Sequence, residues 1–185
     1  VDYVNINIVD PIANLTVANI VQACFDNQDF DKSDPANGNA FCSLIKREPD
    51  GQVINNAAAP GIVSGYVNGK QIKMDAIQAA ATYRTDVAVL GLRRRLELSA
   101  NLFHLRNRLV NITGVAPTQS EGVIGDPKWQ GQLRMRFHDN FGGASFHINY
   151  TGKQWVSYSN RGPAPNEFLE FNHFKPFISI DSSIW

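Results

Sequence analysis

The segment from Trp129 to Trp155, WQGQLRMRFHDNFGGASFHINYTGKQW, alternates apolar and polar side chains on both sides of a short break. A period of two is typical of a β-strand, because successive side chains point to opposite faces of the sheet. The break is polar and contains two glycines, so the segment predicts a β-hairpin with a tight turn. The apolar face carries Leu133, Met135, Phe146 and Ile148, and the polar face carries Gln132, Arg134, Arg136, His147 and Asn149.

The hairpin alone leaves open which solvent meets which face. A soluble sheet with one face on a core and the other in water shows the same alternation as a membrane strand with one face in lipid. The connections between the strands carry the further information.

The same alternation predicts four more strands, at about residues 1–10, 70–84, 96–105 and 174–184. In the third of these the apolar parity changes at Phe103, which suggests a β-bulge. The connections between the six strands alternate strictly between long and short. In an up-and-down sheet every second connection lies at the same end, so one rim carries long loops and the other tight turns, as in bacterial outer-membrane barrels.

This loop pattern predicts an all-β fold: an antiparallel up-and-down meander of six long strands, part of a transmembrane β-barrel. The Leu133 face is expected to meet lipid, and the residues Gln132, Arg134, Arg136, His147 and Asn149 are expected to line a wet interior. Aromatic residues toward the ends of the apolar face, Trp129, Phe137 and Tyr150, are typical of the interfacial girdles of such barrels.

The connection after the first strand, residues 11–68, is far longer than a sheet requires, which marks it as a functional or covering loop. Apolar residues at helical spacing after Thr16 predict a short helix capped by that threonine, and a second turn of helix is expected near residues 40–46. Cys24 and Cys42 enclose a polar segment in this loop. They are either unpaired core residues or the two halves of a disulfide, and a disulfide suits such a flexible segment better. By the chain-entropy estimate the bridge would stabilise the fold by roughly 3 kcal/mol. It would also imply an oxidising compartment.

The charges exclude some functions. Seventeen basic and seventeen acidic residues cancel, so no overall field attracts nucleic acid, and the Arg93–Arg95 run is too short for a nucleic-acid tract.

No stretch has the eighteen or so apolar residues of a membrane-spanning helix. The four histidines lack metal-ligand spacing, the Asp26–Asp34 segment lacks the glycine and glutamate of a calcium loop, and no nucleophile elbow occurs. We expect neither an enzyme nor a metal or cofactor site.

Four segments, taken in order, resemble the C-terminal part of the barrel of TonB-dependent outer-membrane receptors. They are VDYVNINIVDPIANLT, CFDN with AFCSLIKREPDGQV, VNGKQIKMDAIQAAATYR and LELSANLFHLRNRLVNITG, and the similarity extends over nearly the whole chain. By that resemblance the segment after the first strand is an extracellular loop with a helix and a cysteine pair.

The resemblance implies a parent barrel of about 22 strands, plugged by an N-terminal domain, that imports a scarce nutrient. The nutrient class stays open among siderophores, cobalamin and oligosaccharides. The chain would then be a partial barrel without the plug, either an excised fragment or a natural truncation. Its expected partners are the rest of the barrel and the plug, TonB through that plug, outer-membrane lipid and the nutrient, with the bacterial outer membrane as its location.

For nutrient contact the sequence points to the last long loop and its flank. Aromatic and polar side chains there offer a stacking face and hydrogen bonds, although water-exposed loop and girdle residues have the same composition. These candidates are Trp155, Tyr158, Asn160, Arg161 and Glu167. The alternative function is a soluble, secreted β-rich binding or adhesion module held by one disulfide.

Overall fold

The computed structural model describes residues 1–26, 31, 33, 38–56, 59–89, 92–115, 117–157 and 172–185. These residues form mostly antiparallel β-sheet with one α-helix, which confirms the all-β prediction at that level. Contacts divide the chain into two compact units. Unit 1 comprises residues 1–5, 74–108 and 120–185, and unit 2 comprises residues 6–73 and 109–119.

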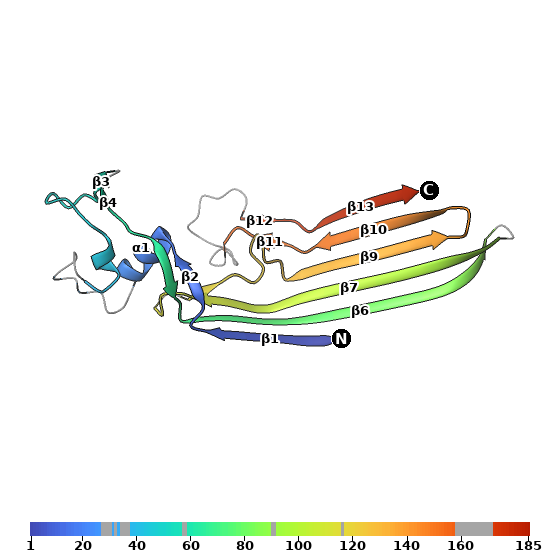
Figure 1. Cartoon of the computed structure of the whole chain (residues 1–185), viewed down its shortest axis with the longest axis horizontal. Helices are drawn as coiled ribbons and strands as arrows, with labels where there is room; N and C mark the ends of the chain where they lie inside the picture. Colours follow the sequence, from blue (N-terminus) through green and yellow to red (C-terminus); the bar gives the residue numbers. More distant parts are fainter. Residues whose placement is uncertain are drawn as a thin grey trace. The chain divides into compact units, whose positions relative to one another are not determined.

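The main sheet has the strand order β1-β6-β7-β9-β10-β13, so each long strand neighbours the next one along the chain. The strands are β1 (Asp2–Val9), β6 (Gln71–Val89), β7 (Leu92–Asn111), β9 (Trp129–His138), β10 (Gly143–Thr151) and β13 (Phe177–Ile184). Within unit 1 the long strands run side by side, as Figure 1 shows. The predicted six-strand meander and the alternation of long and short connections are therefore confirmed for the described residues.

The strand register of unit 1 corrects one prediction, the β-bulge at Phe103. β7 pairs with β9 in an unbroken antiparallel ladder from Arg95 opposite His138 to His104 opposite Trp129. The bulge predicted at Phe103 is therefore wrong. Phe103 keeps the strand parity of Asn101 and lies opposite Gln130, so one aromatic ring projects from the polar side of the sheet. His104, on the other side, stacks on Trp129 with ring centroids 3.9 Å apart.

The turn between β9 and β10 is held by one carboxylate. Asp139 Oδ1 accepts hydrogen bonds from the backbone N–H groups of Phe141, at 2.8 Å, and Gly142, at 3.0 Å. Position 143 requires a glycine, because a Cβ there would lie 2.7 Å from the Phe137 carbonyl oxygen, which is closer than real Cβ contacts allow. This local chemistry explains why the hairpin was predictable with its ends almost correct.

We expect the Asp139 turn to weaken in acid. The two backbone hydrogen bonds, and after them the positive charge of Arg94, lower the pKa of Asp139 below its ordinary value of 3.8. A lowered folded-state pKa stabilises the turn at pH values above 3.8, and this contribution is lost as the pH falls through the folded pKa. The amide proton shifts of Phe141 and Gly142 should therefore titrate together with a midpoint below 3.8. Asp139→Asn should remove the titration, and a midpoint above 3.8 would contradict the assignment.

Unit 2 holds the buried core of the molecule. The helix α1 (Val17–Phe25) begins at Thr16, whose Oγ1 accepts from Asn19 N, and the 3₁₀ helix η1 (Cys42–Leu44) packs near it. Both helical predictions are confirmed. The core residues are Leu15, Ile20, Cys24, Cys42 and Ile45, with Phe41, Leu44, Ile62, Val67 and Ile112 packed against them.

Cys24 and Cys42 form a disulfide at the centre of this core, so the predicted pairing is confirmed. Asn39 links the two segments that carry the cysteines. Its Nδ2 donates to the carbonyl oxygens of Ala23 and Cys24, and its Oδ1 accepts from the backbone N–H of Phe41. One amide thus satisfies carbonyl groups at the end of α1 that have no partner within the helix.

Short strands that the sequence pattern did not predict complete the structure. In unit 2, β2 (Ile12–Leu15) pairs with β5 (Gly65–Asn68), and β3 (Asn55–Asn56) with β4 (Ala59–Pro60). Also in unit 2, β8 (Thr118–Gln119) pairs with the end of β7. In unit 1, β11 (Gln154–Trp155) pairs with β12 (His173–Phe174). Residues 11–68, expected as one long loop, thus contain two small sheets.

Candidate functional site: the polar face of the sheet

The register of β7, β9, β10 and β13 sorts side chains into rows that cross the sheet. A row that begins with an apolar residue of β7 stays free of charged residues across the four strands. The apolar rows are Leu96–Phe137–Ala144–Ile184, Leu98–Met135–Phe146–Ser182, Ala100–Leu133–Ile148–Ile180 and Leu102–Gly131–Tyr150–Ile178. The polar rows between them are Glu97–Arg136–Ser145–Ser183, Ser99–Arg134–His147–Asp181 and Asn101–Gln132–Asn149–Ser179.

The apolar rows are open to solvent in unit 1. Leu133 is 42% exposed and Phe146 is 40% exposed, although both lie on interior strands of the sheet, and Ile180 on the edge strand β13 is 65% exposed. In a soluble sheet such residues pack on a second layer and are mostly buried. Within the described residues of unit 1, this face has no such layer, so it is an extended exposed apolar surface of a kind that marks an interaction site.

Cations lie against aromatic rings toward the ends of this apolar surface. The Arg94 guanidinium lies 5.2 Å from the centroid of Phe137, and Arg94 Nε lies 3.2 Å from Asp139 Oδ2 in an ion pair. Toward the other end, Lys153 Nζ lies 3.9 Å from the centroid of Trp155. An aromatic ring beside a long cationic side chain suits a boundary between an apolar medium and water, because the ring and the methylene stem are apolar whereas the charged end is polar.

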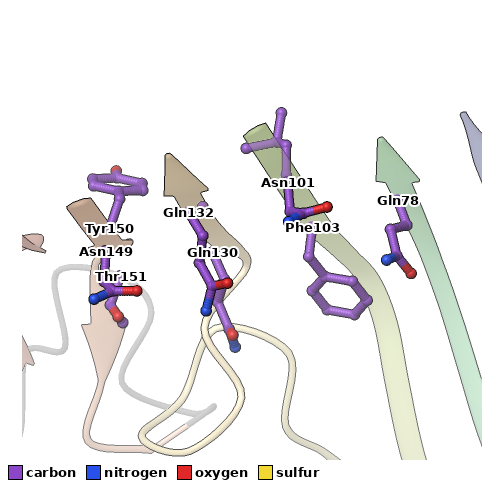
Figure 2. Close-up of a pocket in the computed structure, with 10 residues that line it drawn as sticks. Gln78, Asn101, Phe103, Gln130, Gln132, Asn149, Tyr150 and Thr151 are labelled. Atoms are coloured by element: carbon purple, nitrogen blue, oxygen red, sulfur yellow. The ribbon is translucent and has the colours of Figure 1, made fainter. Parts of the chain in front are cut away.

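The polar face carries an open recess of about 240 Å³, drawn in Figure 2. Its wall contains five carboxamide side chains from four neighbouring strands. We call these residues the amide patch: Gln78, Asn101, Gln130, Gln132 and Asn149. Figure 2 shows the Phe103 ring on the same side of the sheet as these amides, whereas Tyr150 points to the opposite side.

Along the polar face, the charged side chains lie apart from the carboxamide side chains of the amide patch. Arg134 and Arg136 stand in the rows that follow the amide patch toward the β9–β10 turn, and Arg84 Nε lies 3.4 Å from Glu97 Oε1 in that region. The ten residues that line the recess include no acidic or basic side chain. Asn149 Nδ2 donates to Ser179 Oγ at 3.3 Å, which fixes one edge of the patch.

The structure brings together one of the two predicted groups of site residues. Gln132, Arg134, Arg136, His147 and Asn149 share the polar face, in adjacent rows. Trp155, predicted for ligand contact, is half-buried beside His173 in the β11–β12 pair. Tyr158, Asn160, Arg161 and Glu167 lie outside the described residues.

The sequence prediction missed Gln78, Asn101, Phe103, Gln130 and Thr151 as members of one site. Asn101 and Gln130 have the strand parity of the predicted polar face, but the predicted bulge placed Phe103 apart from them. An unbroken alternation of faces along residues 95–104 would have placed Phe103 on the polar face.

No group of three or more His, Cys, Asp or Glu side chains is arranged to hold a metal ion in the ranges given above. Across the same ranges, no helix has both the length and the apolar character needed to cross a membrane. Comparison with models of protein families, with curated proteins and with solved structures finds no match for the chain.

Proposed function

We propose that this chain is a segment of the β-barrel of a TonB-dependent receptor in the bacterial outer membrane, which imports a scarce nutrient. In this proposal the apolar rows of the sheet contact lipid and the polar rows line a water-filled interior. The chain itself catalyses no reaction. Its role is to form part of the barrel wall and to offer polar side chains to the nutrient.

The observation that carries the proposal is the exposure of Leu133 and Ile180 in the central apolar row, on a sheet whose opposite face carries arginines. Leaving large aliphatic side chains in water costs about 1.5–3 kcal/mol for each residue that would otherwise be buried. Hydrocarbon removes this cost without a second protein layer. Apolar-out and polar-in alternation is the pattern of outer-membrane barrels.

Two further features support it. β9 has 10 residues and β10 has 9, which matches the roughly 9–11 residues that a tilted strand needs to cross a bilayer. The rings of Phe137 and Trp129 flank the apolar rows, as expected for residues at the membrane–water boundaries. The four segments that resemble the receptor family lead to the same proposal.

The edges of the sheet identify the partner that the proposal needs. β1 and β13 end the strand order among the described residues, and each has a side without a paired strand. Unpaired backbone groups are not tolerated in lipid, so both edges are expected to pair: with the remainder of the barrel in the whole receptor, and with the edges of further copies when the chain is folded alone in vesicles. The plug domain, and TonB acting through it, would complete the receptor.

The disulfide-linked core of unit 2 favours the alternative function, a soluble secreted binding or adhesion module. That core is apolar and bridged by a disulfide, as in small secreted domains. The same core also suits an extracellular loop of a barrel, so the decision rests on the environment of the apolar rows.

Neighbouring positions of β10 provide the test. Ile148 and Asn149 lie in adjacent rows on opposite faces. The full chain, with a fluorophore on an introduced cysteine in Ile148→Cys or Asn149→Cys, is folded into lipid vesicles, while the native cysteines stay protected by their disulfide. Lipid-attached quenchers should quench the probe at position 148, and aqueous iodide should quench the probe at position 149. A chain that stays monodisperse in buffer and shows no lipid quenching at position 148 would overturn the proposal.

A further inference from the structure

We propose that the amide patch, with Phe103 as its stacking surface, binds a neutral polyhydroxylated ligand, that is, a carbohydrate. This inference deepens the proposed function and rests on it, because it assigns a substrate class to the polar face of the receptor segment.

The hydrogen-bonding chemistry of the patch selects hydroxyl groups. Each carboxamide offers one oxygen acceptor and two N–H donors, and a sugar hydroxyl both donates and accepts. An amide can therefore satisfy a pair of neighbouring hydroxyl groups. Five such groups surround one recess, and four of them, Gln78, Asn101, Gln130 and Gln132, have no side-chain hydrogen bond to another described residue.

The Phe103 ring supplies the apolar part of the site. It projects from the polar face directly opposite Gln130, so its ring lies beside amides from the neighbouring strands. A sugar ring has an apolar face of C–H groups and a rim of hydroxyl groups, which matches an aromatic ring surrounded by amides. Phe103 is half-buried in the sheet, and the exposed part of its ring is open to such a ligand.

The separation of charge argues against an anionic ligand at the patch. A carboxylate or phosphate ligand is bound most strongly by guanidinium groups, which donate in a fixed fork. Two arginines of this face, Arg134 and Arg136, stand in the next polar rows and outside the lining of the recess. The amides and the ring therefore hold a neutral ligand, while an anion would be held beside Arg134 and Arg136 in the next polar rows.

The test uses the full chain folded in amine-oxide micelles, because alkyl-maltoside detergents would themselves present a sugar. The probes are a panel of neutral hexasaccharides built from glucose, galactose, mannose, xylose and N-acetylglucosamine units, with citrate as the anionic comparison. Side-chain NH₂ resonances of Gln130 and Gln132 are followed by NMR. We expect at least one saccharide to shift them saturably.

Variants locate the binding. Gln130→Ala should weaken saccharide binding roughly 2- to 12-fold, the range for one lost hydrogen bond, and Phe103→Ala should weaken it at least as much. The matched control is Ser145→Ala, on the same face but outside the recess, and it should leave the affinity unchanged. The inference would be overturned if no saccharide of the panel shifts these resonances, or if Gln130→Ala and Phe103→Ala both bind the saccharide as tightly as the parent chain.

The outcomes separate this inference from the proposed function. Lipid quenching at position 148 without any saccharide binding would overturn the ligand class and leave the receptor segment. Saccharide binding by a chain that shows no lipid contact would overturn the receptor and support the carbohydrate site on a soluble module.

Discussion

Leu133→Arg is expected to destabilise the chain in lipid vesicles by about 2–4 kcal/mol, the cost of an arginine facing the middle of a bilayer from a barrel strand. Leu133 lies in the central apolar row, between Ala100 and Ile148, so its side chain would be among those farthest from either boundary with water. The replacement puts a guanidinium group where we propose acyl chains. The apolar rows across β7, β9, β10 and β13 contain no carboxylate to neutralise it.

The measurement is urea-induced unfolding of the full chain in vesicles, followed by tryptophan fluorescence. Gln132→Arg is the matched control, since it introduces the same side chain at the adjacent position on the polar face. It should unfold at nearly the same urea concentration as the parent chain. Equal midpoints for the two variants would show that both faces meet the same solvent, which would exclude the lipid-facing assignment.

Removal of the disulfide by Cys24→Ala with Cys42→Ala should cost unit 2 roughly 3 kcal/mol. The bridge closes a loop with a sequence separation of 18 residues, and the chain-entropy estimate for a loop of this size is roughly 3 kcal/mol. Both cysteines are almost completely buried, at 1% and 2% exposure, so the shortened side chains also leave a gap in the core.

Hydrogen exchange of the α1 backbone amides measures this effect. Protection should fall by roughly 100-fold or more in the double variant, the equivalent of about 3 kcal/mol. Val21→Ala is the control, because it shortens a partly exposed side chain on the same helix. Unchanged protection in the double variant would mean that the packing of Ile20, Leu15 and Ile45 holds unit 2 without the bridge.

The hairpin was predictable from the sequence because its determinants are local. Alternation along β9 and β10 assigns each residue to a face, and the Asp139 turn with Gly142 and Gly143 determines where the strands reverse. The helix α1 was predictable for the same reason, since Thr16 and the apolar spacing of the next two turns lie within ten residues of one another.

The amide patch was not predictable as a site, because its members come from four strands. Gln78, Phe103, Gln130 and Asn149 come together only when the register between strands is known. A change of parity within one strand has two local interpretations, a bulge or an aromatic residue on the polar face, and only the pairing of Phe103 with Gln130 distinguishes them. The pairing of β2 with β5 escaped prediction for the same reason.

The sequence by itself determined that Leu133 and Ile148 lie on one face of the strands and that Arg134 and Asn149 lie on the other, because a period of two is a property of the single strand. The tertiary structure decided that these residues align into continuous rows, that the apolar rows stay open among the described residues, and that one aromatic ring joins the amides. Register depends on hydrogen bonds between strands distant in the chain, and a shift of one residue would mix the two faces.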